Sequence, residues 1–245
     1  MEEVQIIFED KNYLVVNKPA GIVTTRENFQ FPKNNFQTNS KKQKTISNLI
    51  YLEDWIREKY GDRGLRRQGI AHRLDKGTSG LVLVAKTEEY LDYFLGLFKT
   101  RKIHKKYIAM VCGEASFWGS INMPIGRNGH IFGKFGVRIE GKNALTLFER
   151  IASINYESKK FSLVKIDLKT GRTHQIRVHF AYLGWPLVSD RIYGGKMVGK
   201  LTRPFLHSCE ISFIDMEGKG VVYKSEPDID LKNTLKLMGY KTIKN

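Results

Sequence analysis

The chain has 245 residues, 41% of them apolar, so it is long enough to bury a hydrophobic core, and its composition argues against intrinsic disorder. Its 41 Lys and Arg residues outnumber its 25 Asp and Glu residues, and the net charge of +16 favours a nucleic-acid partner, with an ordinary basic protein as the alternative. No signal peptide, membrane-spanning run or cysteine-rich motif is visible, which predicts a cytoplasmic protein without membrane contact, disulfide scaffold or thiolate zinc site.

The first predicted element is a β-hairpin. Residues 4–8 and 13–16 are short β-prone runs, and the turn-forming residues 9–12 separate them. The sequence Asn-Lys-Pro-Ala-Gly follows at residues 17–21. Residues 26–44 are rich in Asn, Gln, Lys and Ser, so they predict a basic loop or insertion, which is either passive or in contact with nucleic acid.

A first helix is expected between Thr45, as its N-cap, and residue 60, because Gly61 is a typical stop. Its apolar face is formed by Leu49, Leu52 and Ile56. The apolar runs 70–74 and 81–85 then predict two strands on either side of a tight loop. Asp75 is therefore expected where a strand ends.

The second half of the chain predicts more strands than helices. Thr87 is the expected N-cap of a second helix, with an apolar face of Leu91, Phe94, Leu95 and Phe98. Strand-like runs follow at residues 107–111, 145–151, 161–168 and 205–214. A short helix is expected from Thr173 through Leu183, ended by Gly184 and Pro186. This pattern predicts an α+β fold in which helices and loops flank a mixed, largely antiparallel sheet.

Three polar segments are candidates for chemistry. Residues 72–81 read HRLDKGTSGL and place one carboxylate, Asp75, among cations that favour its ionised form. An ionised carboxylate acts as a nucleophile in many enzymes, although an aspartate in a loop is more often a salt-bridge or capping residue. Residues 99–107 hold five Lys and Arg residues, no acid and a terminal tyrosine, which indicates either phosphate contact or a solvated helix end.

The third segment, residues 170–179, reads TGRTHQIRVH. Its two arginines and the expected helix start are suited to orienting carboxylates or phosphates. His174 and His179 are five residues apart, which does not place them on one helical face, so we expect no metal site. No glycine-rich phosphate-binding motif is present, so ATP and NAD are not expected either.

Together these segments resemble the RluA-type pseudouridine synthases. Residues 72–81 match the family motif HRLDxxTSGL, and residues 170–179 match TGRTHQIRVH. Shorter matches at residues 17–21, 105–107 and 206–208 extend the resemblance over residues 4–226. It implies the pseudouridine synthase catalytic fold in one domain, residues 1–245, without the N-terminal S4 RNA-binding domain that many members carry.

The resemblance also implies roles for individual residues. Asp75 is the expected nucleophile, Tyr107 stacks beside the target base and assists proton transfer, and Arg177 pairs with Asp75 and orients it. Arg73 is expected to fill the gap left when the base is flipped out of the RNA. The other residues expected around the substrate are His72, Thr78, Lys105, Arg172, His174 and Ile176.

The implied reaction detaches uracil from the ribose at N1, rotates it and reattaches it through C5. No atom is gained, so no cofactor, nucleotide or metal is expected. Attack of Asp75 on ribose C1′ or on uracil C6 stays open, since both need an ionised carboxylate. The expected substrate is RNA, with 23S rRNA ahead of tRNA, and the expected state is a monomer. An inactive RNA-binding module and an RNA chaperone are the alternatives.

Two positions depart from the family pattern: Ser189, before Asp190, stands where glycine is usual, and Ser208 where alanine is common. Without an S4 domain, RNA capture falls to the catalytic domain itself. We expect the RNA-binding surface to combine residues 26–44, 63–67 and 99–106, because these segments concentrate the positive charge.

Overall fold

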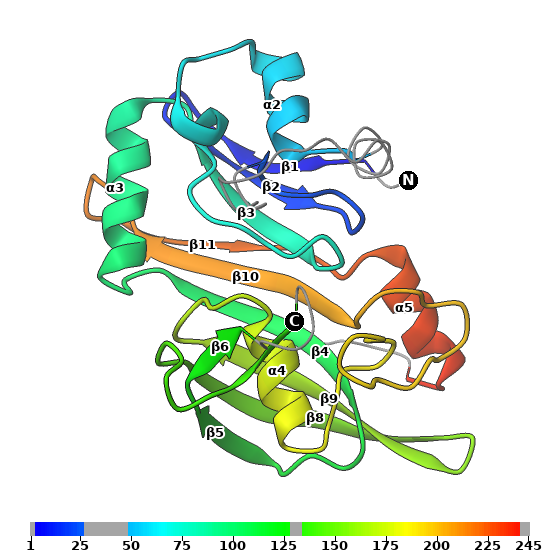
Figure 1. Ribbon diagram of the computed structural model, residues 1–245. Helices are drawn as coiled ribbons and strands as arrows, with labels where there is room; N and C mark the ends of the chain where they lie inside the picture. Colours follow the sequence, from blue (N-terminus) through cyan, green and yellow to red (C-terminus); the bar gives the residue numbers. More distant parts are fainter. Residues whose placement is uncertain (1–2, 27–48, 128–133, 241–245) are drawn as a thin grey trace, which may run out of the picture.

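The computed structural model describes residues 3–26, 49–127 and 134–240. A mixed nine-stranded sheet runs through these residues in the order β1-β2-β3-β10-β4-β9-β8-β5, with β11 paired to β10 (Figure 1). All neighbouring strands are antiparallel except β3 and β10, which are parallel. A smaller sheet joins β6 and β7. The predicted α+β fold with a largely antiparallel sheet is confirmed.

The bounds of the elements are as follows. The strands are β1 Gln5–Glu9, β2 Tyr13–Lys18, β3 Ser79–Ala85, β4 His104–Cys112, β5 Trp118–Asn122, β6 Ile125–Arg127, β7 Phe135–Val137, β8 Leu145–Tyr156, β9 Lys159–Leu168, β10 Leu206–Ile214 and β11 Gly220–Lys224. The helices are α2 Leu52–Tyr60, α3 Glu88–Lys99, α4 Gln175–Tyr182 and α5 Ile229–Leu237, with a short 3₁₀ turn, η2, at Arg66–Gly69. No helix in the described part of the chain is long and apolar enough to cross a membrane.

Helices cover the sheet on both faces. Because side chains alternate along a strand, β3 buries Val82 and Val84 against α2 on one face and Leu81 and Leu83 against α3 on the other. In the same way, β4 and β9 pack against α4 on the face shared with α2 and against α5 on the opposite face. Each fully buried aliphatic side chain contributes about 1.5–3 kcal/mol to stability.

The N-terminal hairpin forms as predicted. β1 pairs with β2 in antiparallel register, and the Asp10 carboxylate closes the turn by accepting from the backbone N–H groups of Asn12 and Tyr13 at 2.7 and 2.8 Å. The strands predicted at 107–111, 145–151, 161–168 and 205–214 lie within β4, β8, β9 and β10. Thr87 caps α3 as expected, because its hydroxyl accepts from the N–H of Tyr90.

The first helix begins later than predicted. Residues 49–51 are not helical, because Val23 exchanges backbone hydrogen bonds with Ile50 and Leu52 at 2.9 and 2.8 Å and holds them extended. The N-cap of α2 is Tyr51, and the expected cap Thr45 lies outside the described residues. The end at Gly61 is confirmed. Of the predicted basic loop 26–44, the described residues include only Arg26.

Residues 70–74 do not form the predicted strand. Ile70 makes one isolated bridge to Val84, after which side chains take the place of backbone partners. His72 Nε2 accepts from the N–H of Leu83 at 3.1 Å. The Thr24 hydroxyl accepts from the N–H of Leu74 at 3.1 Å. Asp75 consequently lies in a turn before β3 rather than at the end of a strand. Its carbonyl oxygen accepts from the N–H of Thr78 at 3.0 Å.

The helix predicted from Thr173 begins at Gln175, and its N-cap is His174, in the left-handed conformation at φ 57° with no side-chain cap. The Gln175 side chain orders the preceding turn instead, since its oxygen accepts from the Thr170 hydroxyl and from the N–H of Arg172. The helix ends at Tyr182, before Gly184, as expected. The short elements β5, β6, β7, β11 and α5 were not predicted.

Candidate active site

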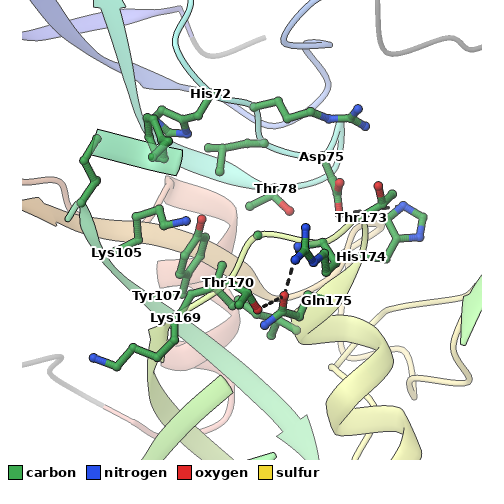
Figure 2. A pocket seen from close by; sticks show the side chains of 18 of the residues that line it. His72, Asp75, Thr78, Lys105, Tyr107, Lys169, Thr170, Thr173, His174 and Gln175 are labelled. Carbon is green, nitrogen blue, oxygen red and sulfur yellow. Dashed lines mark hydrogen bonds and ion pairs between the residues drawn. The ribbon is translucent and has the colours of Figure 1, made fainter. Parts of the chain in front are cut away.

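A pocket of about 450 Å³ opens where three parts of the chain meet: the turn before β3, the start of β4, and the end of β9 with the loop into α4 (Figure 2). The sheet register brings them together. β3 and β10 pair at Ser79 and His207, while the start of β4 pairs with the end of β9 at Tyr107 and Ile166. The pocket therefore lies across the two polar sequence segments, although 88 residues, 82–169, separate them in the sequence.

All ten residues predicted for the site line this pocket. They are His72, Arg73, Asp75, Thr78, Lys105, Tyr107, Arg172, His174, Ile176 and Arg177. The described lining carries seven Lys or Arg side chains and one carboxylate, that of Asp75. A pocket with this excess of positive charge attracts an anionic ligand.

The Asp75 carboxylate is partly exposed, with 20% of its side chain accessible. Its Oδ2 lies 3.6 Å from Nη1 of Arg177 and 3.8 Å from Nε2 of His174. The carboxylate thus has a cationic partner, and its remaining exposure leaves its oxygens accessible to a reactant. These are the two properties that a carboxylate nucleophile needs.

Arg177 is held in place by Asp190. Its Nε and Nη2 donate to the two carboxylate oxygens of Asp190 at 2.6 and 2.8 Å, and both side chains are buried. Burial alone would lower the pKa of Arg177, but the hydrogen bonds and charge of Asp190 raise it, so the guanidinium stays charged. No role was predicted for Asp190 from the sequence, in which it stands next to Ser189. Ser189 adopts φ 61°, which explains why glycine suits that position.

His174 and Tyr193 complete the surroundings of the carboxylate. The Tyr193 hydroxyl oxygen accepts from the N–H of Phe135 at 3.1 Å and lies 3.0 Å from Nδ1 of His174. The contact with Tyr193 fixes the orientation of the imidazole, so that its other nitrogen, Nε2, faces Asp75. Burial lowers the pKa of His174, and the charge of Asp75 opposes that shift. Tyr193 was not predicted to take part.

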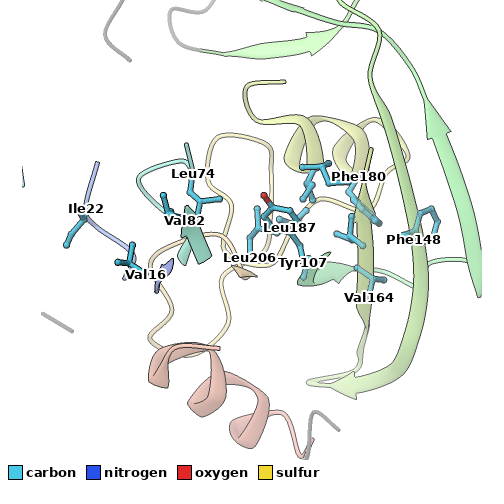
Figure 3. Close-up of a cluster of buried hydrophobic side chains, with 14 of the residues drawn as sticks. Val16, Ile22, Leu74, Val82, Tyr107, Phe148, Val164, Phe180, Leu187 and Leu206 are labelled. Carbon is cyan, nitrogen blue, oxygen red and sulfur yellow. The ribbon is translucent and has the colours of Figure 1, made fainter. Parts of the chain in front are cut away.

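Tyr107 lies on the inner wall of the pocket and is 5% exposed. It belongs to the apolar cluster formed by Leu74, Ile176, Leu206 and their neighbours (Figure 3). Burial, and the charge of Asp75 to a smaller degree, raises the pKa of Tyr107, so its ring presents a neutral phenol to the pocket. A buried aromatic ring and an accessible carboxylate in one pocket are suited to a planar, unsaturated ligand.

The other predicted residues differ in accessibility. Arg73 is exposed at the rim, whereas Thr78 and Ile176 are buried. Arg172 donates from Nε to the carbonyl oxygen of Asn143 at 3.0 Å. Burial lowers the pKa of His72 to about 3, so this imidazole is neutral, and its Nε2 is occupied by the backbone of β3.

The expected charged surface is only partly assembled at the pocket. Lys99 and Arg101 line it, but Lys106 pairs with Glu210 at 2.7 Å on the adjoining strand β10. Arg63 donates to the carbonyl oxygen of Gln68 at 2.6 Å and so supports the loop containing η2. Arg67 adds its positive charge near Arg73.

Comparisons with known proteins assign the chain to a family. Residues 12–182 match the family model described as RNA pseudouridylate synthase. The chain is 37% identical over 194 residues to "Ribosomal large subunit pseudouridine synthase D" of Borreliella burgdorferi, across 78% of this chain and 55% of that protein. It is 32% identical over 245 residues to the protein of that name from Zymomonas mobilis, across 96% of this chain and 72% of the relative.

The chain thus spans only about half the length of some relatives it matches. Among solved structures, "Human RNA Pseudouridylate Synthase Domain Containing 1" superposes with a TM-score of 0.71 at 24% identity, covering 98% of this chain and 88% of that one. This structural likeness supports the fold.

Proposed function

The chain belongs to the RNA pseudouridylate synthase family, and from this premise we propose that it is an enzyme that isomerises uridine to pseudouridine in RNA. The observation that carries the proposal is the position of Asp75, the one carboxylate among the described residues of a cationic pocket, 3.6 Å from a buried arginine and in the same pocket as the buried Tyr107. We propose that the catalytic unit is a single domain.

In the proposed mechanism, Asp75 is the nucleophile, and Arg177 pairs with its carboxylate and orients it. The target uridine is flipped into the pocket, where its ring lies against Tyr107 and the adjoining side chain of Ile176. Arg73, exposed at the rim, occupies the place that the base leaves in the RNA. The charge balance of the pocket supports these roles, because an RNA strand brings its phosphates close to the rim cations.

We propose large-subunit rRNA as the substrate, because several relatives are named for that RNA. This substrate places the enzyme in the cytoplasm, and we propose that it works as a monomer, since one chain supplies all the residues required. Transfer RNA is the competing substrate, and tritium release from separate rRNA and tRNA pools distinguishes the two.

The test is tritium release from RNA labelled at uracil C5, because reattachment through C5 expels that hydrogen. Unmodified 23S rRNA and tRNA pools are treated in parallel. We expect release by the native protein and a fall of at least ~10³-fold in Asp75→Asn, which removes the nucleophile with little change in shape. Asp92→Asn is the matched control, because Asp92 is exposed on α3 and does not line the pocket. Absence of release from both pools by folded, RNA-binding protein would overturn the proposal.

A further inference from the structure

Lys105 has an unusual environment for a lysine. It precedes Tyr107 by two residues on β4, so the two side chains share one face of the strand and both extend into the pocket (Figure 2). The side chain is partly buried, and its Nζ lies 5.5 Å from the centre of the Phe98 ring. A Cβ placed on Gly171 would lie 3.6 Å from this Nζ. The amine is therefore enclosed by pocket walls.

Within the described residues, this amine makes no hydrogen bond or ion pair, and its contact is with an aromatic ring. The acidic side chain that influences it is Asp167, but Oδ2 of Asp167 pairs with Lys169 at 2.6 Å. Burial of a cation without a carboxylate partner is costly, and burial lowers the pKa of Lys105 to about 8. The pocket thus holds a positive charge that the protein itself leaves uncompensated.

Resting on the proposed function, we propose that the Lys105 ammonium binds an anionic oxygen of the flipped uridine. Both routes considered for Asp75 place negative charge on the uracil ring. In attack on C1′, an Asp75 oxygen bonds to C1′ as the N1–C1′ bond breaks, and the bonding electrons remain on uracil, shared among N1, O2 and O4. In the other route an Asp75 oxygen adds to C6, and the electrons of the C5–C6 double bond move toward C5 and O4. The other anionic oxygen of the nucleotide is its phosphate.

Lys105 is suited to this role because Arg177 and Lys169 already have carboxylate partners. A donor aimed at developing charge in a water-poor site contributes more to catalysis than the same donor in water. Lys105 would therefore be a catalytic residue if it contacts the ring and a binding residue if it contacts phosphate. Both cases require its charge inside the pocket.

The experiment compares Lys105→Met with Lys165→Met, the matched control whose lysine is also partly buried but lies on β9 and does not line the pocket. Three quantities are measured on 23S rRNA: the single-turnover rate at saturating enzyme, the dissociation constant, and the slope of log affinity against log salt. If Lys105 contacts the ring, its loss lowers the rate about 10²-fold with unchanged affinity. If it contacts phosphate, affinity falls and the salt slope decreases by about one.

The proposal is overturned if rate, affinity and salt slope of Lys105→Met all stay within twofold of the native values. Lys105→Gln repeats the charge removal if the methionine variant does not fold, and Lys105→Arg, which keeps the charge, should recover part of the lost function. Tritium release by the native protein reports the proposed function separately. If that release is absent, the proposed function fails. The inference about Lys105 is then tested by RNA affinity and salt slope alone. If neither quantity changes in Lys105→Met, the inference is overturned.

Discussion

Asp190 lies closer to Arg177 than Asp75 does: the two hydrogen bonds to Asp190 measure 2.6 and 2.8 Å, whereas Nη1 of Arg177 is 3.6 Å from Oδ2 of Asp75. A bidentate pair fixes the plane of the guanidinium as well as its position. The third nitrogen is thereby aimed at the proposed nucleophile. Asp190 thus acts on the site through Arg177 rather than by touching a reactant.

Asp190→Asn should slow the reaction about 10²-fold, because Arg177 would lose the partner that orients it toward Asp75. Breaking a buried ion pair should also lower the free energy of unfolding by about 3–5 kcal/mol. Single-turnover rates at a temperature where the variant is folded, together with urea denaturation, measure both effects. RNA affinity should be unchanged.

The matched control is Asp228→Asn, which weakens another buried pair, between Asp228 and Arg203 at 3.2 Å, outside the pocket. It should lose stability but keep its rate within about threefold. If Asp190→Asn loses stability and keeps its rate as well, the positioning role of Asp190 is wrong.

Gly80 and Gly96 should respond to alanine with opposite signs. Gly80 pairs with Ser208 across the parallel strands at φ 119°, and an added Cβ would lie 2.3 Å from the Ser208 carbonyl oxygen. Gly80→Ala should destabilise the fold by at least about 2 kcal/mol. Gly96, within α3, has nothing within 4 Å of an added Cβ, so Gly96→Ala should stabilise it by about 0.5–1 kcal/mol. Urea denaturation measures both, and equal shifts would contradict the structure.

His207 makes stability depend on pH. It is fully buried between the hydroxyls of Ser79 and Ser225, at 2.9 and 3.0 Å, and burial lowers its pKa to about 3. Below pH about 6.5 the unfolded chain binds a proton here that the folded chain does not, so stability should fall as the pH is lowered from about 6.5 toward 3. One such histidine contributes at most about 1.4 kcal/mol per pH unit.

Urea denaturation between pH 7 and about pH 4 tests this, with His207→Gln as the comparison. The difference in stability between native protein and variant isolates the histidine, because the carboxylates titrate in both. As the pH falls, the free energy of unfolding of the native protein should decrease steadily relative to that of the variant. A constant difference would show that His207 does not remain neutral in the fold.

Much of the fold was predictable because β-prone apolar runs mark several strands, as in β4, β9 and β10. One error lies where side chains take over backbone hydrogen bonds. The ring of His72 and the hydroxyl of Thr24 replace ladder bonds, so residues 70–74 are extended without forming a strand. No local pattern of apolar residues reveals such a substitution.

The ten site residues were predictable because they lie in two continuous motifs and in the segment ending at Tyr107. Asp190 and Tyr193 were missed as partners because they come from the loop between α4 and β10, which has no helical or strand periodicity. Their contacts with Arg177 and His174 depend on how that loop folds back over α4. The unpartnered state of Lys105 likewise depends on long-range packing.

The cations at the rim should govern RNA affinity through phosphate contacts. Lys99 and Arg101 are exposed and line the pocket, and Asn suits position 101 because Arg101 adopts φ 60°. The double variant Lys99→Gln, Arg101→Asn should bind RNA more weakly, and its salt slope should decrease by about 0.7–0.9 per lost contact, because fewer counterions are released. Its rate at saturating enzyme should be unchanged, since neither side chain reaches Asp75.

The control Lys159→Gln, Lys160→Gln removes two exposed charges at the start of β9, about 30 Å along the strand from the pocket. Equal loss of affinity in both double variants would mean that overall charge, rather than this rim, binds the RNA.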